Sequence, residues 1–190
     1  MKKILLASVA GAGLLASCGS TYVDGGYVEA REIRTEYRTA SGQYVACDNV
    51  LQNGQQQAAS NQVAVYFDAA GSISSLNVNL RGNTINDYDD NYSATFTGSQ
   101  LASVGNGSYK AVFQAEPGTG LLPQAITVNP APKTVKIVSV SGTPAGSFYA
   151  ALTLSNGTDT GTASTQLLGT KGNIPVYSNC TVQSVTTETL

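Results

Sequence analysis

The sequence predicts an all-β fold, an antiparallel β-sandwich or β-barrel of about ten short strands with one disulfide. Runs rich in Val, Ile, Thr, Tyr and Phe recur along the chain, and these residue types favour strands. Turn residues separate the runs at short intervals, a spacing typical of sandwiches and barrels. The expected strands are 43–47, 62–67, 72–80, 92–97, 108–116, 124–129, 134–140, 147–155, 163–168 and 175–186.

The most charged segment of the chain, residues 29–38, precedes these runs and is expected to form a further strand. Read with a period of two, one face carries uncharged residues: Tyr27, Ile33, Thr35 and Tyr37. The other face carries charges of alternating sign: Glu32, Arg34, Glu36 and Arg38. A helix would instead align Glu29, Ile33 and Tyr37, but the interleaved Tyr, Ile and Thr favour a strand. The charges either protect an edge strand from pairing with a neighbour or form a docking ridge for a partner.

Two Asn-Gly pairs are the best candidates for tight hairpin turns. In Asn106-Gly107 and Asn156-Gly157, both residues accept the positive φ angles that two-residue hairpin loops require. Residues 52–62 differ from the rest of the chain because they are rich in Gln and Asn and poor in apolar side chains. We expect a long loop there, or a short helix over 55–59.

The first twenty residues have the features of an export signal. Lys2 and Lys3 supply a positive start, and residues 4–15 form an apolar core shorter than the roughly 20 residues that a membrane-spanning helix needs. The core ends in Leu15-Ala16-Ser17-Cys18, which resembles the lipobox of bacterial lipoproteins. The resemblance covers residues 1–20 and implies cleavage before Cys18, with acyl chains on its thiol and on the new amine.

This resemblance divides the chain into three parts. Residues 1–17 are the lipoprotein signal peptide that is removed, 18–26 are the lipidated cysteine and a short tether, and 27–190 are a single all-β domain. Gly19 stands where some members of this family carry the Asp that retains them at the inner membrane, so the expected location is the outer membrane or cell surface. The alternative is an ordinary secretory signal cleaved near residues 10–12, with Cys18 incidental.

Two cysteines remain in the expected domain. Cys47 and Cys180 both lie in strand-like runs, and an even pair in an oxidising compartment favours one disulfide. The bond would join the first and the last part of the domain, and it would stabilise the fold by about 4–5 kcal/mol on the chain-entropy model. Two buried free thiols are the alternative.

The charge of the chain excludes some classes of partner. Charged residues make up 12% of the sequence, and the part after residue 17 holds eight basic and twelve acidic residues, a net charge of −4. A mildly acidic domain with scattered charge lacks the basic footprint that nucleic acid requires, and it lacks a basic patch for anionic lipid headgroups. We therefore expect contact with the membrane through the N-terminal lipid.

The sequence contains no histidine, which removes most common catalytic and metal sites. Ser-His and Cys-His nucleophile pairs and His-based zinc or copper sites all need an imidazole. A carboxylate-based hydrolase remains as an alternative, with Asp68, Glu116 and the group 87–90 as its acids, although the sequence pairs none of them. We expect no catalytic residues and no cofactor, with calcium as the alternative.

One acidic loop has the beginning of a calcium-binding pattern. Asp87, Asp89 and Asn91 have D-x-D-x-N spacing, which places hard oxygen ligands at alternate positions. Tyr92 stands where an EF-hand has Gly, and Gly98 stands where it has its bidentate Glu, so an EF-hand is excluded. The residues predict either a looser calcium site or a polar turn whose side chains bond their own backbone.

The same loop carries the tyrosines that form a candidate contact surface. Tyr88 and Tyr92 lie in or beside it, and an exposed pair would suit a partner or a glycan. We expect most of the other tyrosines to be half-buried strand residues with their hydroxyls in water. Leu121-Leu122-Pro123 is an apolar loop tip that either packs under the fold or docks a partner.

Together these features predict a lipid-anchored, extracytoplasmic envelope protein with a structural or accessory, non-catalytic role in a larger cell-surface assembly. An envelope protein is its expected partner. The first alternative is a binding module for a glycan, a small apolar ligand or calcium, which a tyrosine-lined cavity would favour. The second is a carboxylate-based hydrolase, which a close pair of buried acids would favour.

Overall fold

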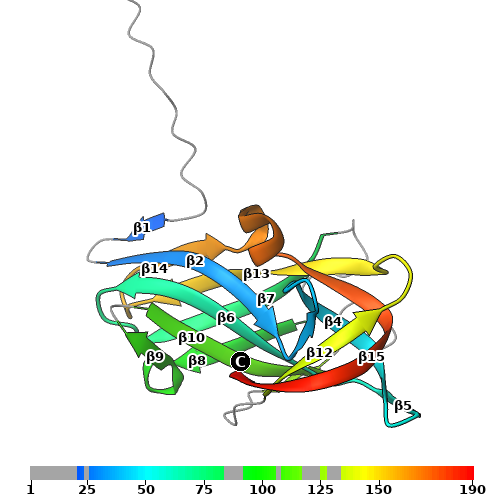
Figure 1. The fold of residues 1–190 in the computed structure, drawn as a ribbon. Coiled ribbons are helices and arrows are strands. Elements are labelled where there is room, and N and C mark those ends of the chain that lie inside the picture. The colour runs from blue at the N-terminus through cyan, green and yellow to red at the C-terminus, as the bar shows by residue number, and fades with distance from the viewer. Residues whose placement is uncertain (1–20, 24–25, 84–91, 106–107, 117–124, 128–133) are drawn as a thin grey trace, which may run out of the picture.

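The structure is a computed structural model that describes residues 21–23, 26–83, 92–105, 108–116, 125–127 and 134–190. Strands dominate it, and they form two sheets that pack against each other (Figure 1). The described residues include two short 3₁₀ segments, η1 (Gly98–Gln100) and η2 (Gln166–Lys171). The predicted all-β, sandwich-like class is confirmed.

Six strands form the smaller sheet, in the order β1-β2-β6-β10-β11 with β9 beside β10. Their bounds are β1 (Thr21–Val23), β2 (Gly26–Thr35), β6 (Asn61–Ala70), β9 (Ala102–Gly105), β10 (Ser108–Glu116) and β11 (Ala125–Thr127). Nine strands form the larger sheet, in the order β5-β4-β3-β12-β15-β13-β7-β8 with β14 beside β13. Their bounds are β3 (Tyr37–Thr39), β4 (Tyr44–Gln52), β5 (Gln55–Ala58), β7 (Ser75–Gly82), β8 (Tyr92–Thr97), β12 (Thr134–Val140), β13 (Gly146–Ser155), β14 (Thr160–Ser164) and β15 (Ile174–Thr189).

The main hydrophobic core lies between the two sheets. On β6, the alternate residues Val63, Val65 and Phe67 are fully buried. They belong to one cluster with Val78 of β7 and Leu152 of β13, which come from the larger sheet. Because side chains alternate across a strand, one face of each of these strands is buried in this core and the other faces away from it.

Four strands of the larger sheet close into a ring. β4 pairs with β3, β3 with β12, β12 with β15, and β15 again with β4. A second hydrophobic cluster draws its residues from all four strands and includes Tyr37, Val45, Cys47, Val138 and Cys180. The larger sheet is therefore barrel-like at one end, whereas β13, β7 and β8 at its other end pack over the smaller sheet.

Two of the ring pairings are parallel, so the antiparallel expectation is wrong for them. They join β3 to β12 and β4 to β15, while the other pairings are antiparallel. Parallel neighbours need a long connection between them. Here the chain leaves β4, passes through the smaller sheet and the open end of the larger sheet, and then returns as β15.

Residues 52–62 form neither a long loop nor a helix. Asn53 and Gly54 have φ angles of 53° and 77°, and the chain returns after them as β5, paired with β4. Positive φ at both central positions is the mark of a tight hairpin turn, which Asn-Gly favours. All four residues of β5 are exposed, so this strand lacks the apolar alternation that marks the others.

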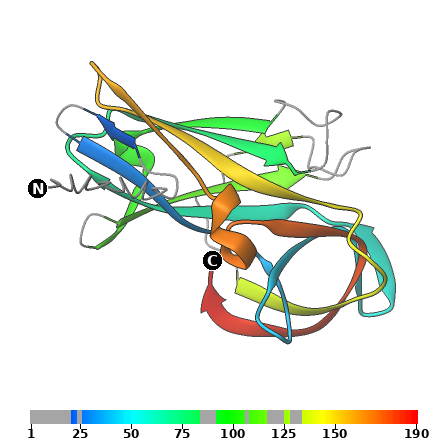
Figure 2. The ribbon, with the colours of Figure 1, turned by 90° about the horizontal axis from the view of Figure 1, so that it is seen from above.

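The strand expected over 163–168 ends earlier than the sequence suggests. β14 stops at Ser164, because the buried Thr165 hydroxyl donates to the carbonyl of Gly172 and thereby closes the chain into η2. Figure 2, seen from above Figure 1, shows the orange η2 coil in front of the strands. Gly172 cannot be replaced without movement, because an added Cβ would lie 1.7 Å from the carbonyl oxygen of Thr165.

Of the two expected Asn-Gly hairpin turns, one is a longer loop. Four residues separate β13 from β14, and Gly157 has a φ of 101°. The Asn156 Oδ1 accepts hydrogen bonds from the backbone amides of Thr158 and Asp159, which holds the loop in shape. The second turn, at residues 106–107, lies outside the part of the chain that the structure describes.

The charged segment is extended, as expected, but its charged face is broken at Glu36. β2 ends at Thr35 in the smaller sheet and β3 begins at Tyr37 in the larger one, so the chain crosses between the sheets at Glu36. Glu36 is 1% exposed, and its Oε2 lies 3.6 Å from Lys136 Nζ. The expectation that it shares one face with Arg34 is therefore wrong, because the crossing turns its side chain inward.

The start of the domain also differs from expectation. Thr21–Val23, expected as part of a tether, form β1, which pairs with residues 26–28 of β2. Over residues 29–35, β2 pairs with β6 on one side and has no strand partner on the other among the described strands. β2 is thus an edge strand over most of its charged length.

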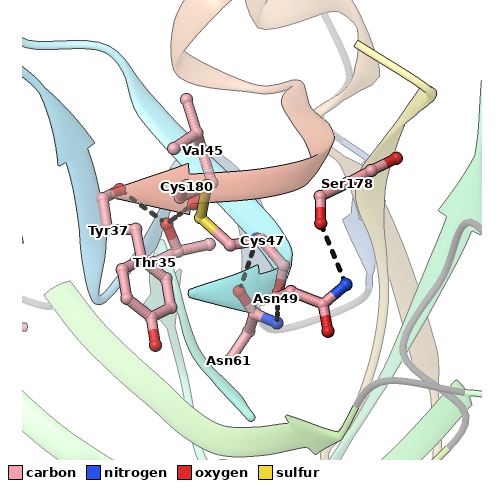
Figure 3. The surroundings of a disulfide bond; sticks show 8 residues. All are labelled: Thr35, Tyr37, Val45, Cys47, Asn49, Asn61, Ser178 and Cys180. Carbon is pink, nitrogen blue, oxygen red and sulfur yellow. Dashed lines mark hydrogen bonds between the residues drawn. A yellow bond between two sulfur atoms is a disulfide. The ribbon is translucent and has the colours of Figure 1, made fainter. Parts of the chain in front are cut away.

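The predicted disulfide is confirmed, and it joins neighbouring strands of the ring (Figure 3). Cys47 on β4 and Cys180 on β15 are bonded, with their Cα atoms 5.9 Å apart. Asn61, at the start of β6, donates from Nδ2 to the Cys47 carbonyl and accepts at Oδ1 from the Cys47 amide, each at 2.9 Å. Thr35, at the end of β2, donates its hydroxyl to the Val45 carbonyl. These side chains tie the smaller sheet to the ring.

Candidate functional site

Strand register brings tyrosines and charged residues together on the smaller sheet. Tyr66 on β6 lies opposite Glu32 on β2 and opposite Lys110 on β10. Two residues along β6, Asp68 lies opposite Ser108 on β10. Because Phe67 between them is buried in the core, Tyr66 and Asp68 point to the outer face of the sheet.

This surface continues onto the strands of the ring. Tyr44 of β4 contacts Arg34 of β2 and donates a hydrogen bond to Glu188 of β15, while Lys110 of β10 lies over the ring of Tyr66. We call this surface the aromatic–charged face, and it consists of Glu32, Arg34, Tyr44, Tyr66, Lys110 and Glu188.

Arg34 lies at the centre of the aromatic–charged face. Its guanidinium lies 4.5 Å from the ring centroid of Tyr66 and 5.7 Å from that of Tyr44, and it is paired with Glu32. Burial alone would lower the pKa of Arg34, but the hydrogen bond and charge of Glu32 outweigh burial and raise it. The side chain keeps 27% of its surface exposed. Cation–π contacts of this kind are worth about 0.5–1 kcal/mol at exposed sites and more where water is excluded.

The end of β15 and Leu190, which follows it, complete the surface at its other end. Glu188 accepts a hydrogen bond from the Tyr44 hydroxyl at 3.1 Å and pairs with Arg38 at 2.7 Å. The Lys110 ammonium donates to the carbonyl of Leu190 at 2.9 Å. Burial and the negative Glu188 raise the pKa of the Tyr44 phenol, while the nearby guanidinium groups oppose this rise. The phenol is therefore neutral at physiological pH and donates to the carboxylate.

Asp68 is held by two donors at the edge of the same face. Arg31 donates from Nε at 2.6 Å, and the Ser108 hydroxyl donates at 2.6 Å. Burial pushes the pKa of Asp68 up, but the hydrogen bonds from Arg31 and Ser108 and the charge of Arg31 outweigh it and lower the pKa below its ordinary value. Asp68 is therefore ionised and fixed in place.

The lowered pKa of Asp68 gives a pH-dependent contribution to stability. A carboxyl whose pKa is lower in the folded state stabilises the fold above the unfolded pKa of about 3.9, and this stabilisation is lost as the pH falls through the folded pKa. We expect Asp68→Asn to cost about 1 kcal/mol or less at pH 7, and to cost progressively less below pH 4. Urea unfolding of both proteins between pH 7 and pH 2.5 measures this difference. Parallel stability curves over that range would contradict the assignment.

Two hollows open beside the aromatic–charged face, and Glu32 lines both. The first has a volume of about 420 Å³ and is lined by Glu32, Ile33, Ser41, Gly42, Gln43, Tyr44, Thr170 and Lys171. The second has a volume of about 310 Å³ and is lined by Arg31, Glu32, Tyr66, Phe67, Asp68, Ser108 and Tyr109. The Tyr109 ring stacks on Phe67 with their centroids 5.7 Å apart, so the wall of the second hollow rests on the main core.

The chemistry of these groups favours recognition over catalysis. The two acids of the second hollow each have a cation, Glu32 with Arg34 and Asp68 with Arg31. A general acid needs a raised pKa, whereas that of Asp68 is lowered. The described ranges contain no group of three or more His, Cys, Asp or Glu side chains placed to hold a metal ion. Tyrosine and arginine, in contrast, are the residue types that dominate binding hot spots.

Most of the site residues predicted from the sequence lie outside the described residues. Asp87, Tyr88, Asp89 and Asn91 fall there, so the calcium site stays a prediction. Tyr92 begins β8, and its backbone pairs with Leu80 of β7, but its side chain is not described. The lipidation residue Cys18 and the apolar tip at 121–123 also lie outside.

Sequence reasoning missed the aromatic–charged face because its members come from five strands. Tyr44 and Tyr66 were expected only as ordinary half-buried strand tyrosines, and β6 stood apart from the charged segment in the sequence. One signal was present, because Arg34 and Glu32 occupy the charged face of 29–38 that we interpreted as edge protection or a docking ridge. The pairing of β2 with β6 brings this charged segment beside Tyr66, and the sequence did not indicate that pairing.

Comparison with known proteins gives no family for the chain. No helix in the described parts of the chain is long and apolar enough to cross a membrane. No protein-family model matches the sequence, and neither the curated proteins nor the solved structures contain a significant match.

Proposed function

We propose that the chain is a lipid-anchored extracytoplasmic protein with a non-catalytic accessory role, and that it binds an envelope protein partner through the aromatic–charged face. The arrangement of Arg34 between Tyr44 and Tyr66 carries this proposal. The lipobox at residues 15–18 indicates the expected location outside the cytoplasm. The disulfide supports the same location, because structural disulfides are typical of oxidising compartments.

Three properties of the face suit protein binding. Tyrosine and arginine supply large contact areas with a polar end, and they are enriched at hot spots. Arg34, Tyr44 and Glu188 hold one another in place, so binding would order few side chains and lose little entropy. Acids and bases alternate across the face, which favours a partner with complementary mixed charge over a strongly charged polymer. Anchoring raises the local concentration, so that even modest affinity is effective.

The anchor is tested on the protein from its native envelope. We expect mass spectrometry to find a mature chain beginning at Cys18 with acyl chains attached, and we expect the protein in the membrane fraction. Cys18→Ser should release it into the soluble extracytoplasmic fraction, because no lipid then holds it. A wild-type protein that carries no acyl mass and fractionates as soluble would contradict the anchor.

Docking is tested by light crosslinking in the same envelopes, followed by sizing in mild detergent and identification of companions. We expect the wild-type protein to migrate with one defined complex, and Tyr66→Ala to lose that complex. Tyr149→Ala is the matched control, because Tyr149 is a half-buried tyrosine on β13 of the larger sheet. Loss of the complex in both variants, or migration of the wild type as a lipidated monomer, would refute docking through this face.

A second candidate is a glycan-binding module, which the second hollow favours. Tyr66 and Tyr109 line it together with the carboxylates of Glu32 and Asp68, and sugars bind to aromatic rings flanked by hydrogen-bonding groups. Soluble cell-wall oligosaccharides are the probe. Binding that Tyr66→Ala removes and Tyr149→Ala retains would favour this candidate over the protein partner.

A further inference from the structure

We propose that the η2 loop rests on the membrane surface, with Leu167 inserted among the lipid headgroups. This inference deepens the proposed function and rests on acylation of Cys18. It assigns a membrane-facing side to the domain. The anchor alone would leave the domain free to rotate relative to the membrane. The occupant of this surface is the bilayer that holds the lipid.

Leu167 is the most exposed large hydrophobic residue in the described parts of the chain. The residue is 70% exposed, compared with 54% for Val185 and 39% for Leu51. Its neighbour Leu168 packs against the main core, so η2 is fixed to the domain while Leu167 projects from it. A single exposed leucine is ordinary on a protein surface, so its position relative to the anchor must carry the argument.

Hydrogen bonds hold η2 in one conformation. The buried Thr165 hydroxyl accepts from the Ala150 amide at 3.0 Å and donates to the Gly172 carbonyl at 2.7 Å. Asn173 donates from Nδ2 to the carbonyls of Gln166 and Gly169, at 2.8 and 2.9 Å. Leu167 therefore projects from an ordered turn, and its insertion into lipid would require little further ordering.

β1, the first described element after the expected anchor, lies on the same side of the molecule as η2. Figure 1 shows β1 and the η2 coil along the upper side, and Figure 2, seen from that side, shows the coil in front of the strands. Both elements contact the same strand, because β1 pairs with the start of β2 and residues 170–171 line a hollow with Glu32 and Ile33. β1 and η2 thus lie along one side of β2.

The length of the tether then places this side close to the lipid. Three residue steps separate Cys18 from Thr21, the first residue of β1, and they reach at most about 10 Å. A lipid-held Cys18 keeps β1 within that distance of the headgroups. Leu167 has an apolar end to insert, and the exposed Lys171 at the end of η2 adds a cation that suits anionic headgroups. One leucine binds lipid too weakly to hold a protein, so its contribution is orientation.

The absence of tryptophan from the chain allows a direct test. Leu167→Trp introduces a single fluorophore at η2, and Val185→Trp introduces the matched control on the C-terminal half of β15, which runs along the lower side in Figure 1. Both lipidated proteins are placed in vesicles of phosphatidylethanolamine and phosphatidylglycerol that contain brominated lipid. We expect blue-shifted, strongly quenched emission from residue 167 and unshifted, weakly quenched emission from residue 185.

The corresponding Cys18→Ser proteins, mixed with the same vesicles, give the emission of each tryptophan without the anchor. Equal quenching at the two positions, or stronger quenching at 185, would overturn the inference while leaving an acylated anchor intact. Mass spectrometry of Cys18 on the same samples separates the two failures. A chain without acyl groups would overturn both the proposed function and this inference.

Discussion

Replacing Cys47 and Cys180 together by alanine is expected to lower the free energy of unfolding by about 5 kcal/mol, because the bond closes a loop of 133 residues. Most of this loss arises in the unfolded chain, which the bond would otherwise restrain. A loss of this size is comparable with the whole stability of many single domains. Guanidinium unfolding of Cys18→Ser protein, with and without the two further substitutions, measures it.

The reduced wild-type domain is the control for this prediction. Reduction breaks the bond but keeps both sulfurs in the ring cluster, so it separates the loss of the crosslink from the loss of buried volume. We expect reduction to account for the larger part of the change in midpoint. An unchanged midpoint after verified reduction would show that the crosslink does not stabilise this domain.

The second large effect is expected at Asn61, which is 2% exposed and pairs with both backbone groups of Cys47. Asn61→Ala would leave a buried amide and a buried carbonyl without these partners, and each such loss costs about 1–3 kcal/mol. We therefore expect a decrease of about 2–6 kcal/mol in the free energy of unfolding, from the same principle applied to two groups. Urea unfolding with an unchanged denaturant slope is the measurement.

Asn49→Ala is the matched control on the same strand as Cys47. Asn49 donates one hydrogen bond to the Ser178 carbonyl in an exposed position, so water replaces the lost partner (Figure 3). We expect its cost to be well under that of Asn61→Ala. Equal costs for the two variants would mean that the Asn61 amide does not stabilise the link between the smaller sheet and the ring.

The sequence predicted the strands that bury one face in the core. The alternation of Val63, Val65 and Phe67 and the apolar run of β13 reflect contacts with the main core, and a local pattern records such burial directly. β5 was missed because all of its residues are exposed, although Asn53-Gly54 was the available signal for a hairpin. A local pattern does not indicate which strands pair with each other, so the parallel pairs of the ring were not predicted.

The candidate site was harder to predict for the same reason. Arg34, Tyr44 and Tyr66 meet only because β2 pairs with β6 while the ring brings β4 alongside. Glu36 shows the opposite difficulty, since its alternating position suggested a shared charged face. The crossing of the chain between the sheets buries it beside Lys136 instead. Cys47 and Cys180 were predicted because cysteine chemistry adds a long-range constraint that hydrophobic patterns lack.

The position of β15 has a consequence for when this chain folds. Residues 174–189 pair with β12, β13 and β4, so the ring stays open and Cys47 stays unpaired until the C-terminal part of the chain arrives. If the chain is exported N-terminus first, as proposed, it stays incompletely folded while it crosses the membrane and can pass through a narrow translocation channel. Contacts between residues so distant in sequence form slowly. The fold is thus completed only after its C-terminal strand has become available for pairing.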